Sequence, residues 1–166
     1  MKGNMAKKIL LVDDEKAIRD SLSKLLCTEG YEVVLAMDGQ QAIQMLVQEP
    51  IDILILDVGL PVKDGWATLR WLTQVNPLFP VILITGRWNQ TELAEAAGVD
   101  VLMEKPLNVP LLLQHIHELL QEPPQARHRK RSFKSVSCDI EKFCEQMYKR
   151  LTMPFPSGGP RHSKDH

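Results

Sequence analysis

Short aliphatic runs alternate with segments of helical spacing along most of this chain. The runs occupy residues 9–12, 31–36, 51–56, 81–85 and 101–103. The segments after them repeat apolar residues three and four positions apart, at 18–26, 42–47, 67–75, 92–97 and 109–120. Continuous apolar runs are typical of strands buried on both faces. The alternation therefore predicts an α/β fold, a doubly wound five-stranded parallel sheet with helices on both faces.

Polar and charged side chains stand where these predicted strands end. Asp13 and Asp14 come directly after the first run, and Asp57 comes after the third. Thr85 ends the fourth run, and Lys105 follows the fifth. In a doubly wound sheet, ligands bind at the carboxyl ends of the strands, near the point where the strand order reverses. We therefore expect three carboxylates, a hydroxyl and an ammonium to meet at one edge of the sheet.

Three neighbouring carboxylates repel one another unless a cation balances their charge. Mg²⁺ fits this motif better than Zn²⁺, because the motif contains no histidine or cysteine. Such an ion would also neutralise a phosphoryl group arriving at Asp57. Taken alone, an aspartate after a strand is usually a turn or helix-capping residue. The combination at four strand ends, in this order, favours the functional interpretation.

The motifs at these strand ends carry a resemblance to a known family. They are Leu11-Val12-Asp13-Asp14-Glu15, Leu56-Asp57-Val58-Gly59-Leu60-Pro61 with Asp64-Gly65, Thr85-Gly86, and Lys105-Pro106. Over residues 7–121 the chain resembles the receiver domain of two-component response regulators, of the single-domain type. The resemblance implies a flavodoxin-like fold and phosphoryl transfer from a sensor histidine kinase or phosphotransfer protein to Asp57. It implies a protein that accepts a phosphoryl group and dephosphorylates itself, rather than a multiple-turnover enzyme.

The resemblance also assigns the ligands of the expected Mg²⁺. Asp14 would contact the ion directly and Asp13 mainly through water. Asp57 and the backbone carbonyl of Gly59 would complete the protein ligands. Because the last of these is a backbone oxygen, it does not depend on the side chain at that position.

The resemblance implies that Thr85 and Lys105 bind the phosphoryl group. Thr85 would move toward that group, and this movement would switch the conformation of the protein. The peptide bond before Pro106 is expected to be cis. Leu102 is atypical, since most receivers have Tyr or Phe at this switch position on the fifth strand. Either leucine is a tolerated core substitution, or the switch couples differently or more weakly. The stretch from Thr85 to Lys105 is also about two residues shorter than usual in this family, which predicts a short or displaced fourth helix.

The net charge of −1 hides two parts of opposite sign. Residues 1–122 hold 10 basic and 17 acidic residues, and residues 123–166 hold 10 basic and 4 acidic residues. The three cysteines lack metal-site spacing, which favours a reduced, cytoplasmic protein. No apolar run approaches the roughly 20 residues needed to span a membrane.

The C-terminal region is predicted to have three parts. Residues 122–136 are a basic linker, either solvated or bound to nucleic acid, acidic lipid or an acidic protein face. Residues 137–152 have the spacing of an amphipathic helix, whose apolar side would need the receiver body, a second copy in a homodimer, or another protein. Residues 153–166 are rich in Pro and Gly and are predicted to be disordered.

The favoured hypothesis is a regulator that binds an unidentified downstream protein when Asp57 is phosphorylated. An alternative is a phosphorylation-independent interaction module that acts through the C-terminal tail. A phosphohydrolase is disfavoured, because Gly59 stands where a second acid–base aspartate would be needed. DNA binding by the family's usual output domains is not expected, since the tail is short and has no helix-turn-helix pattern.

Overall fold

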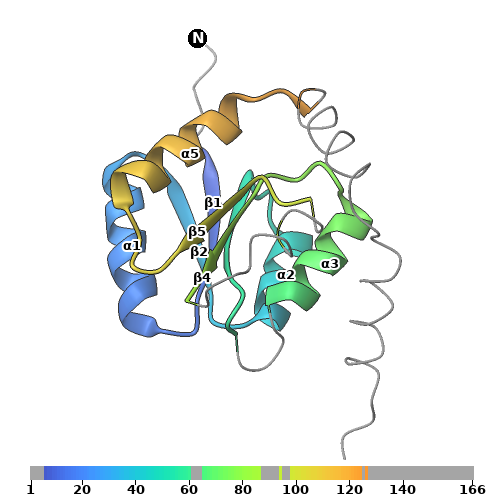
Figure 1. The fold of residues 1–166 in the computed structure, drawn as a ribbon, viewed down its shortest axis with the longest axis horizontal. Coiled ribbons are helices and arrows are strands. Elements are labelled where there is room, and N and C mark those ends of the chain that lie inside the picture. Colours follow the sequence, from blue (N-terminus) through green and yellow to red (C-terminus); the bar gives the residue numbers. More distant parts are fainter. Residues whose placement is uncertain (1–5, 61–64, 87–93, 95–97, 125, 127–166) are drawn as a thin grey trace, which may run out of the picture.

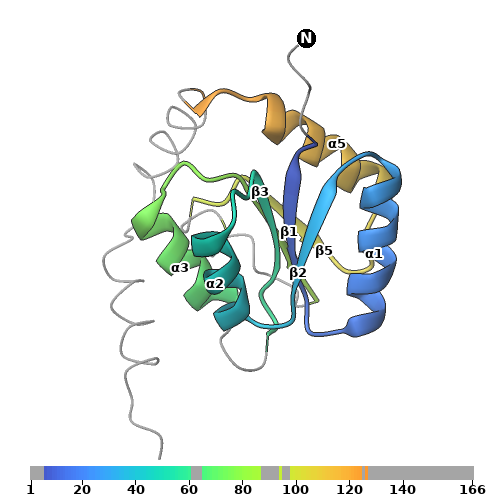
Figure 2. The same ribbon diagram turned by 180° about the vertical axis from the view of Figure 1, so that it is seen from behind.

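A five-stranded parallel sheet lies between two layers of helices in the computed structural model of the chain (Figure 1; Figure 2 from behind). The structure describes residues 6–60, 65–86, 94, 98–124 and 126. The strands are β1 (Lys8–Val12), β2 (Glu32–Ala36), β3 (Ile53–Asp57), β4 (Val81–Thr85) and β5 (Val101–Glu104). The described helices are α1 (Lys16–Thr28), α2 (Gly39–Gln48), α3 (Gly65–Val75) and α5 (Val109–Gln121). The predicted doubly wound α/β fold is confirmed.

In the strand order β2-β1-β3-β4-β5, the direction in which successive strands are added to the sheet reverses between β1 and β3. The chain leaves β1 toward β2 on one side and returns to β3 on the other, so the loops after β1 and β3 diverge. The register pairs Val12 of β1 with Leu56 of β3. The next residues along these strands, Asp13 and Asp57, therefore lie side by side at the carboxyl edge.

Two separate hydrophobic cores form because successive strand residues face opposite sides of the sheet. On the side of α2 and α3, the strands contribute Leu10, Val12, Leu54, Leu56, Val81 and Leu83. On the side of α1 and α5, they contribute Ile9, Leu11, Ile53, Ile55, Ile82, Ile84 and Met103. Figure 1 shows the two helix layers on opposite faces. The continuous aliphatic runs in the sequence therefore reflect burial on both faces.

Side-chain hydrogen bonds cap the N-termini of two of the described helices. At the start of α2, Asp38 accepts a hydrogen bond from the backbone N–H of Gln41 at 2.8 Å. At the start of α5, Asn108 accepts one from the backbone N–H of Leu111 at 3.1 Å. Such side chains satisfy N–H groups that have no partner within the helix.

The observed boundaries differ from the predicted ones at β3. This strand was predicted at residues 51–56, but Asp57 is its last residue and pairs with Ile84 of β4. The ladder continues past the aliphatic run, because the backbone of an aspartate pairs as well as that of a leucine. Hydrophobicity alone could not reveal this extension.

Some predictions fall on residues outside the described ranges. Of the helix predicted at 92–97, only Ala94 is described, and it is buried. The tail predictions from residue 127 onward lie entirely outside. None of the helices in the described ranges has the length and apolarity that crossing a membrane requires.

Helix α3 begins against the backbone of the phosphoacceptor candidate. A Cβ atom on Gly65 would lie 2.5 Å from Cα of Val58 and 3.0 Å from the carbonyl carbon of Asp57. Neither neighbour is a flexible side-chain end that could move aside easily. Glycine is therefore required here to let the start of α3 approach the end of β3.

Leu54→Ala should lower the free energy of unfolding by about 2–5 kcal/mol, because the side chain is fully buried in the sheet. Val47→Ala, at a residue 70% exposed on α2, is the matched control and should change stability by less than about 0.5 kcal/mol. Urea unfolding followed by circular dichroism measures both. Equal effects would contradict the described core.

Gly65→Ala should destabilise the protein by about 1–3 kcal/mol, because the added methyl group overlaps fixed backbone. Gly86→Ala is the control, since a Cβ there meets no atom within 4 Å in the described residues. Thermal unfolding of the two variants separates close backbone approach from a general effect of replacing glycine. A fully stable Gly65→Ala protein would show that α3 does not approach Asp57 this closely.

Candidate functional site

Three aspartates from two strand ends form a compact acidic cluster. One carboxylate oxygen from each of Asp13, Asp14 and Asp57 lies within 4.8 Å of those of the other two. Asp13 is 1% exposed and Asp57 is 4% exposed, whereas Asp14 is exposed. The sheet thus brings together the three carboxylates that the sequence placed after strands one and three.

Lys105 joins two of these carboxylates from the loop after β5. Its Nζ donates hydrogen bonds to Oδ2 of Asp57 at 2.8 Å and to Oδ2 of Asp13 at 3.0 Å. Burial alone would lower the pKa of Lys105, but the hydrogen bonds to Asp57 and Asp13 outweigh burial and raise that pKa above its ordinary value. The ammonium is therefore charged at neutral pH and partly balances the cluster.

Asp13 is held at all of its polar atoms. Its Oδ1 accepts a hydrogen bond from the backbone N–H of Glu15 at 2.8 Å, and its own N–H donates to the carbonyl of Ala36 at 3.3 Å. Its carbonyl accepts a hydrogen bond from Nη1 of Arg19 at 2.6 Å. Burial raises the pKa of Asp13 above its usual value, although the hydrogen bonds from Lys105 and Glu15 oppose that change.

Asp57 is held at both carboxylate oxygens. Oδ2 accepts from Lys105, and Oδ1 accepts from the backbone N–H of Gly59 at 2.7 Å. Gly59 itself is exposed, and a Cβ there would stand 3.2 Å from Oδ1 of Asp57. The glycine therefore places no side chain against the Asp57 carboxylate at this position.

Thr85 and Leu102 occupy the neighbouring strands. Thr85 is fully buried at the end of β4, and its carbonyl accepts a hydrogen bond from the backbone N–H of Lys105 at 2.8 Å. Leu102 is half-buried on β5, paired with Leu83, and packs against the core on the side of α2 and α3. The Lys105–Pro106 peptide is cis, the form that the resemblance implied.

This donor set fits a hard divalent cation. It consists of carboxylate oxygens, which Mg²⁺ prefers, and no histidine or cysteine belongs to the cluster in the described part of the chain. One ammonium faces three carboxylates, so the cluster retains net negative charge. Asp14 is the exposed member, and it is therefore the carboxylate most accessible to an ion from solvent.

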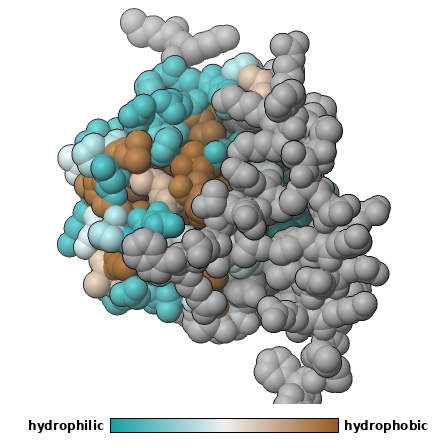
Figure 3. All heavy atoms as spheres, viewed as in Figure 1, coloured by the Kyte–Doolittle hydropathy of each residue, from teal (hydrophilic) through white to brown (hydrophobic). Residues whose placement is uncertain are grey.

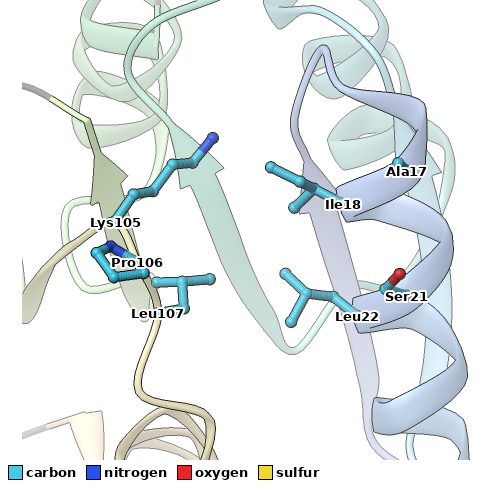
Figure 4. A pocket seen from close by; sticks show the side chains of 7 residues that line it. All are labelled: Ala17, Ile18, Ser21, Leu22, Lys105, Pro106 and Leu107. Atoms are coloured by element: carbon cyan, nitrogen blue, oxygen red, sulfur yellow. The ribbon is translucent and has the colours of Figure 1, made fainter.

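An apolar groove borders the site on the side of α1. Figure 4 shows Lys105, Pro106 and Leu107 facing Ile18 and Leu22 of α1 across it, with Ala17 and Ser21 completing the lining. Figure 3 shows apolar side chains gathered over the part of the surface that α1 and α5 occupy in Figure 1.

Sequence reasoning did not single out this groove or Arg19. An arginine in the first turn of a helix gives no local signal, and the groove forms only when α1 meets the loop after β5. The groove depends on contacts between segments that the strand pattern does not relate, and the Arg19 contact depends on the path of the turn between β1 and α1.

Known proteins resemble most of the described part of the chain. The family model for the response regulator receiver domain matches residues 9–117. Transcriptional regulatory protein CpxR of Escherichia coli (strain K12) is 40% identical over 116 residues, 69% of this chain and 49% of that protein. Response regulator MprA of Mycobacterium ulcerans (strain Agy99) is 36% identical over 119 residues, 70% of this chain and 51% of that protein. The chain thus spans about half the length of these curated relatives.

Solved structures with similar sequences share the fold. A CheY-like receiver domain protein from Methanospirillum hungatei JF-1 has a TM-score of 0.66 and 30% identity, covering 75% of this chain and 98% of that one. Response regulator TrrA from Thermotoga maritima, solved in complex with Mg(2+)-BeF, has a TM-score of 0.64 and 30% identity, covering 68% and 98%. With the motif residues gathered at one sheet edge and the family match over residues 9–117, the chain belongs to the receiver domain family of two-component response regulators.

Proposed function

We propose that this protein is a phosphoacceptor switch in which Asp57 takes a phosphoryl group in a Mg²⁺-dependent reaction. The observation that carries the proposal is the setting of the Asp57 carboxylate. The side chain of Asp57 is 6% exposed, and its carboxylate is held by the N–H of Gly59 and the ammonium of Lys105 beside two more aspartates. These contacts fix a nucleophile in place and leave its approach clear at Gly59.

The donor is a phosphohistidine of a sensor histidine kinase or of a phosphotransfer protein, and the transfer takes place in the cytoplasm. A carboxylate oxygen of Asp57 attacks phosphorus, the P–N bond to the imidazole breaks, and the imidazole leaves with a proton from solvent. The product is an acyl phosphate on Asp57. Hydrolysis of that bond by water resets the switch, and we propose that the protein acts as such a switch rather than as a multiple-turnover enzyme.

Asp13, Asp14, Asp57 and the carbonyl of Gly59 would hold the Mg²⁺. When bound, the ion supplies positive charge that offsets repulsion between the carboxylates and the incoming phosphoryl oxygens. Lys105 already pairs with Asp57 and Asp13, so its ammonium lies within reach of a phosphoryl group on Asp57. It would exchange part of its pairing with the carboxylates for pairing with that group.

The conformational change caused by phosphorylation would be transmitted through β4 and β5. Thr85 lies one residue beyond Ile84, the partner of Asp57 on β4, and its movement toward the phosphoryl group would shift the end of that strand. On β5, Leu102 offers aliphatic packing where the family usually has an aromatic ring. We propose that the phosphorylated form binds a downstream protein through the surface around the shifted ends of β4 and β5. No aromatic side chain at position 102 would rotate in this change.

Treatment with Mg²⁺ and acetyl phosphate should add one phosphoryl group, detected by intact-protein mass spectrometry as an adduct stable in acid and labile in base. Asp57→Asn should abolish the adduct, because the amide is not a nucleophile for phosphorus. Asp52→Asn is the matched control, since that residue lies just before β3 and pairs with Lys7 away from the cluster. An adduct that persists in Asp57→Asn would overturn the proposal.

Removal of Mg²⁺ with a chelator should prevent phosphorylation of the wild-type protein. Asp14→Asn should slow the reaction by more than the roughly tenfold loss typical when a group supporting a metal ligand is removed. Asp20→Asn, which removes the same charge from an α1 residue paired with Lys16, should leave the rate unchanged. Phosphorylation rates measured against Mg²⁺ concentration test this. Equal rates in the two variants would exclude Asp14 as a ligand.

A further inference from the structure

The turn between β1 and α1 carries Asp13 and Asp14 but lacks the usual side-chain cap. Glu15 is the N-cap residue of α1, and its side chain makes no capping hydrogen bond. Both α2 and α5, by contrast, have capping side chains in Asp38 and Asn108. Other contacts therefore hold the acidic turn, and one of them is the hydrogen bond from the N–H of Glu15 to Oδ1 of Asp13.

Arg19 supplies a further restraint from within α1. Its backbone N–H donates to the carbonyl of Glu15 at 3.1 Å, which places it in the first turn of the helix. Its half-buried side chain folds back, and Nη1 donates a 2.6 Å hydrogen bond to the carbonyl of Asp13. A hydrogen bond with a charged donor is stronger than one between neutral groups.

The position of that carbonyl oxygen restrains the backbone of Asp14. The Asp13 carbonyl belongs to the peptide unit that joins Asp13 to Asp14, and a peptide unit is planar. Holding its oxygen therefore restrains the orientation of the whole unit, including the nitrogen and Cα of Asp14. Asp14 makes no hydrogen bond or ion pair of its own among the described residues, so its backbone is placed by this unit and by the next one, whose N–H at Glu15 donates to Oδ1 of Asp13.

We propose that Arg19 is a positioning residue for cation binding, which orients the Asp13–Asp14 peptide so that both carboxylates face the ion. The inference rests on the proposed Mg²⁺-dependent function. Arg19 does not contact the ion or the reacting atoms and acts only through the backbone of Asp13.

The two effects that Arg19 could have on cation binding differ in sign. Its positive charge lies near the site, so by charge alone its removal would strengthen the binding of Mg²⁺. Loss of its hydrogen bond to the Asp13 carbonyl would let the peptide unit rotate and would weaken binding. The direction of the change in affinity therefore identifies which effect governs.

The test is calorimetric titration of the full chain with Mg²⁺ in the wild type, in Arg19→Met and in Lys16→Met. Arg19→Met should bind Mg²⁺ about tenfold more weakly, the loss typical of removing a group that orients a metal ligand. Lys16→Met removes the same charge from the first turn of α1, at a side chain 80% exposed and paired with Asp20, and should bind as tightly as wild type or tighter. Unchanged or tighter binding in Arg19→Met overturns the inference.

Two further measurements separate this role from folding and from the function itself. With acetyl phosphate as donor, Arg19→Met should need more Mg²⁺ but reach the wild-type rate at saturation, and a lowered plateau with an unchanged midpoint overturns the inference. Arg19→Lys, which retains the charge on a shorter side chain, should also bind Mg²⁺ more weakly, and wild-type affinity in both variants overturns the inference.

No Mg²⁺ binding in the wild type would overturn the proposed function, whereas normal wild-type binding with an unaffected Arg19→Met overturns this inference alone.

Discussion

The arrangement of the site depends on one ammonium shared by two buried carboxylates. Lys105 reaches Asp13 and Asp57 from the loop after β5, so three strand ends are tied together at a single point. Taking such charges out of water is costly, and only the pairing with one another and the hydrogen bonds around them offset that cost. Because one ammonium faces three carboxylates, the cluster keeps a net negative charge. The same interaction that stabilises the edge of the sheet thus keeps it receptive to a cation.

The buried polar side chains of the strands, those of Asp57 and Thr85, stand at the carboxyl edge of the sheet. Both faces of the strands are filled with aliphatic side chains, so the packing of α1, α2, α3 and α5 does not depend on the carboxylates. Gly65 then lets α3 start directly against the backbone of Asp57. Asp57 consequently stands at a strand end that is packed against the start of a helix.

Positively charged side chains restrain the acidic turn from two sides. Lys105 holds the Asp13 side chain, whereas Arg19 holds its backbone carbonyl. Asp14, the next residue, is left exposed. A turn restrained at one residue and open at the next is compatible with the proposed binding of a cation from solvent. Leu102 packs against the core beside α2 and α3 and makes no part of this acidic cluster.

The sequence by itself determined the fold class, the order of the strands and helices, and which residues stand at the strand ends, because burial on both faces leaves a continuous aliphatic signal. It placed Asp13, Asp57 and Lys105 correctly at one edge, since parallel strands share their carboxyl ends. It could not show that the ladder of β3 includes Asp57, because a backbone hydrogen bond has no side-chain signature. Only the tertiary structure decided that Arg19 holds the Asp13 carbonyl and that Gly65 approaches Asp57. Those contacts depend on the angle at which each helix packs on the sheet, which the spacing of apolar residues does not encode.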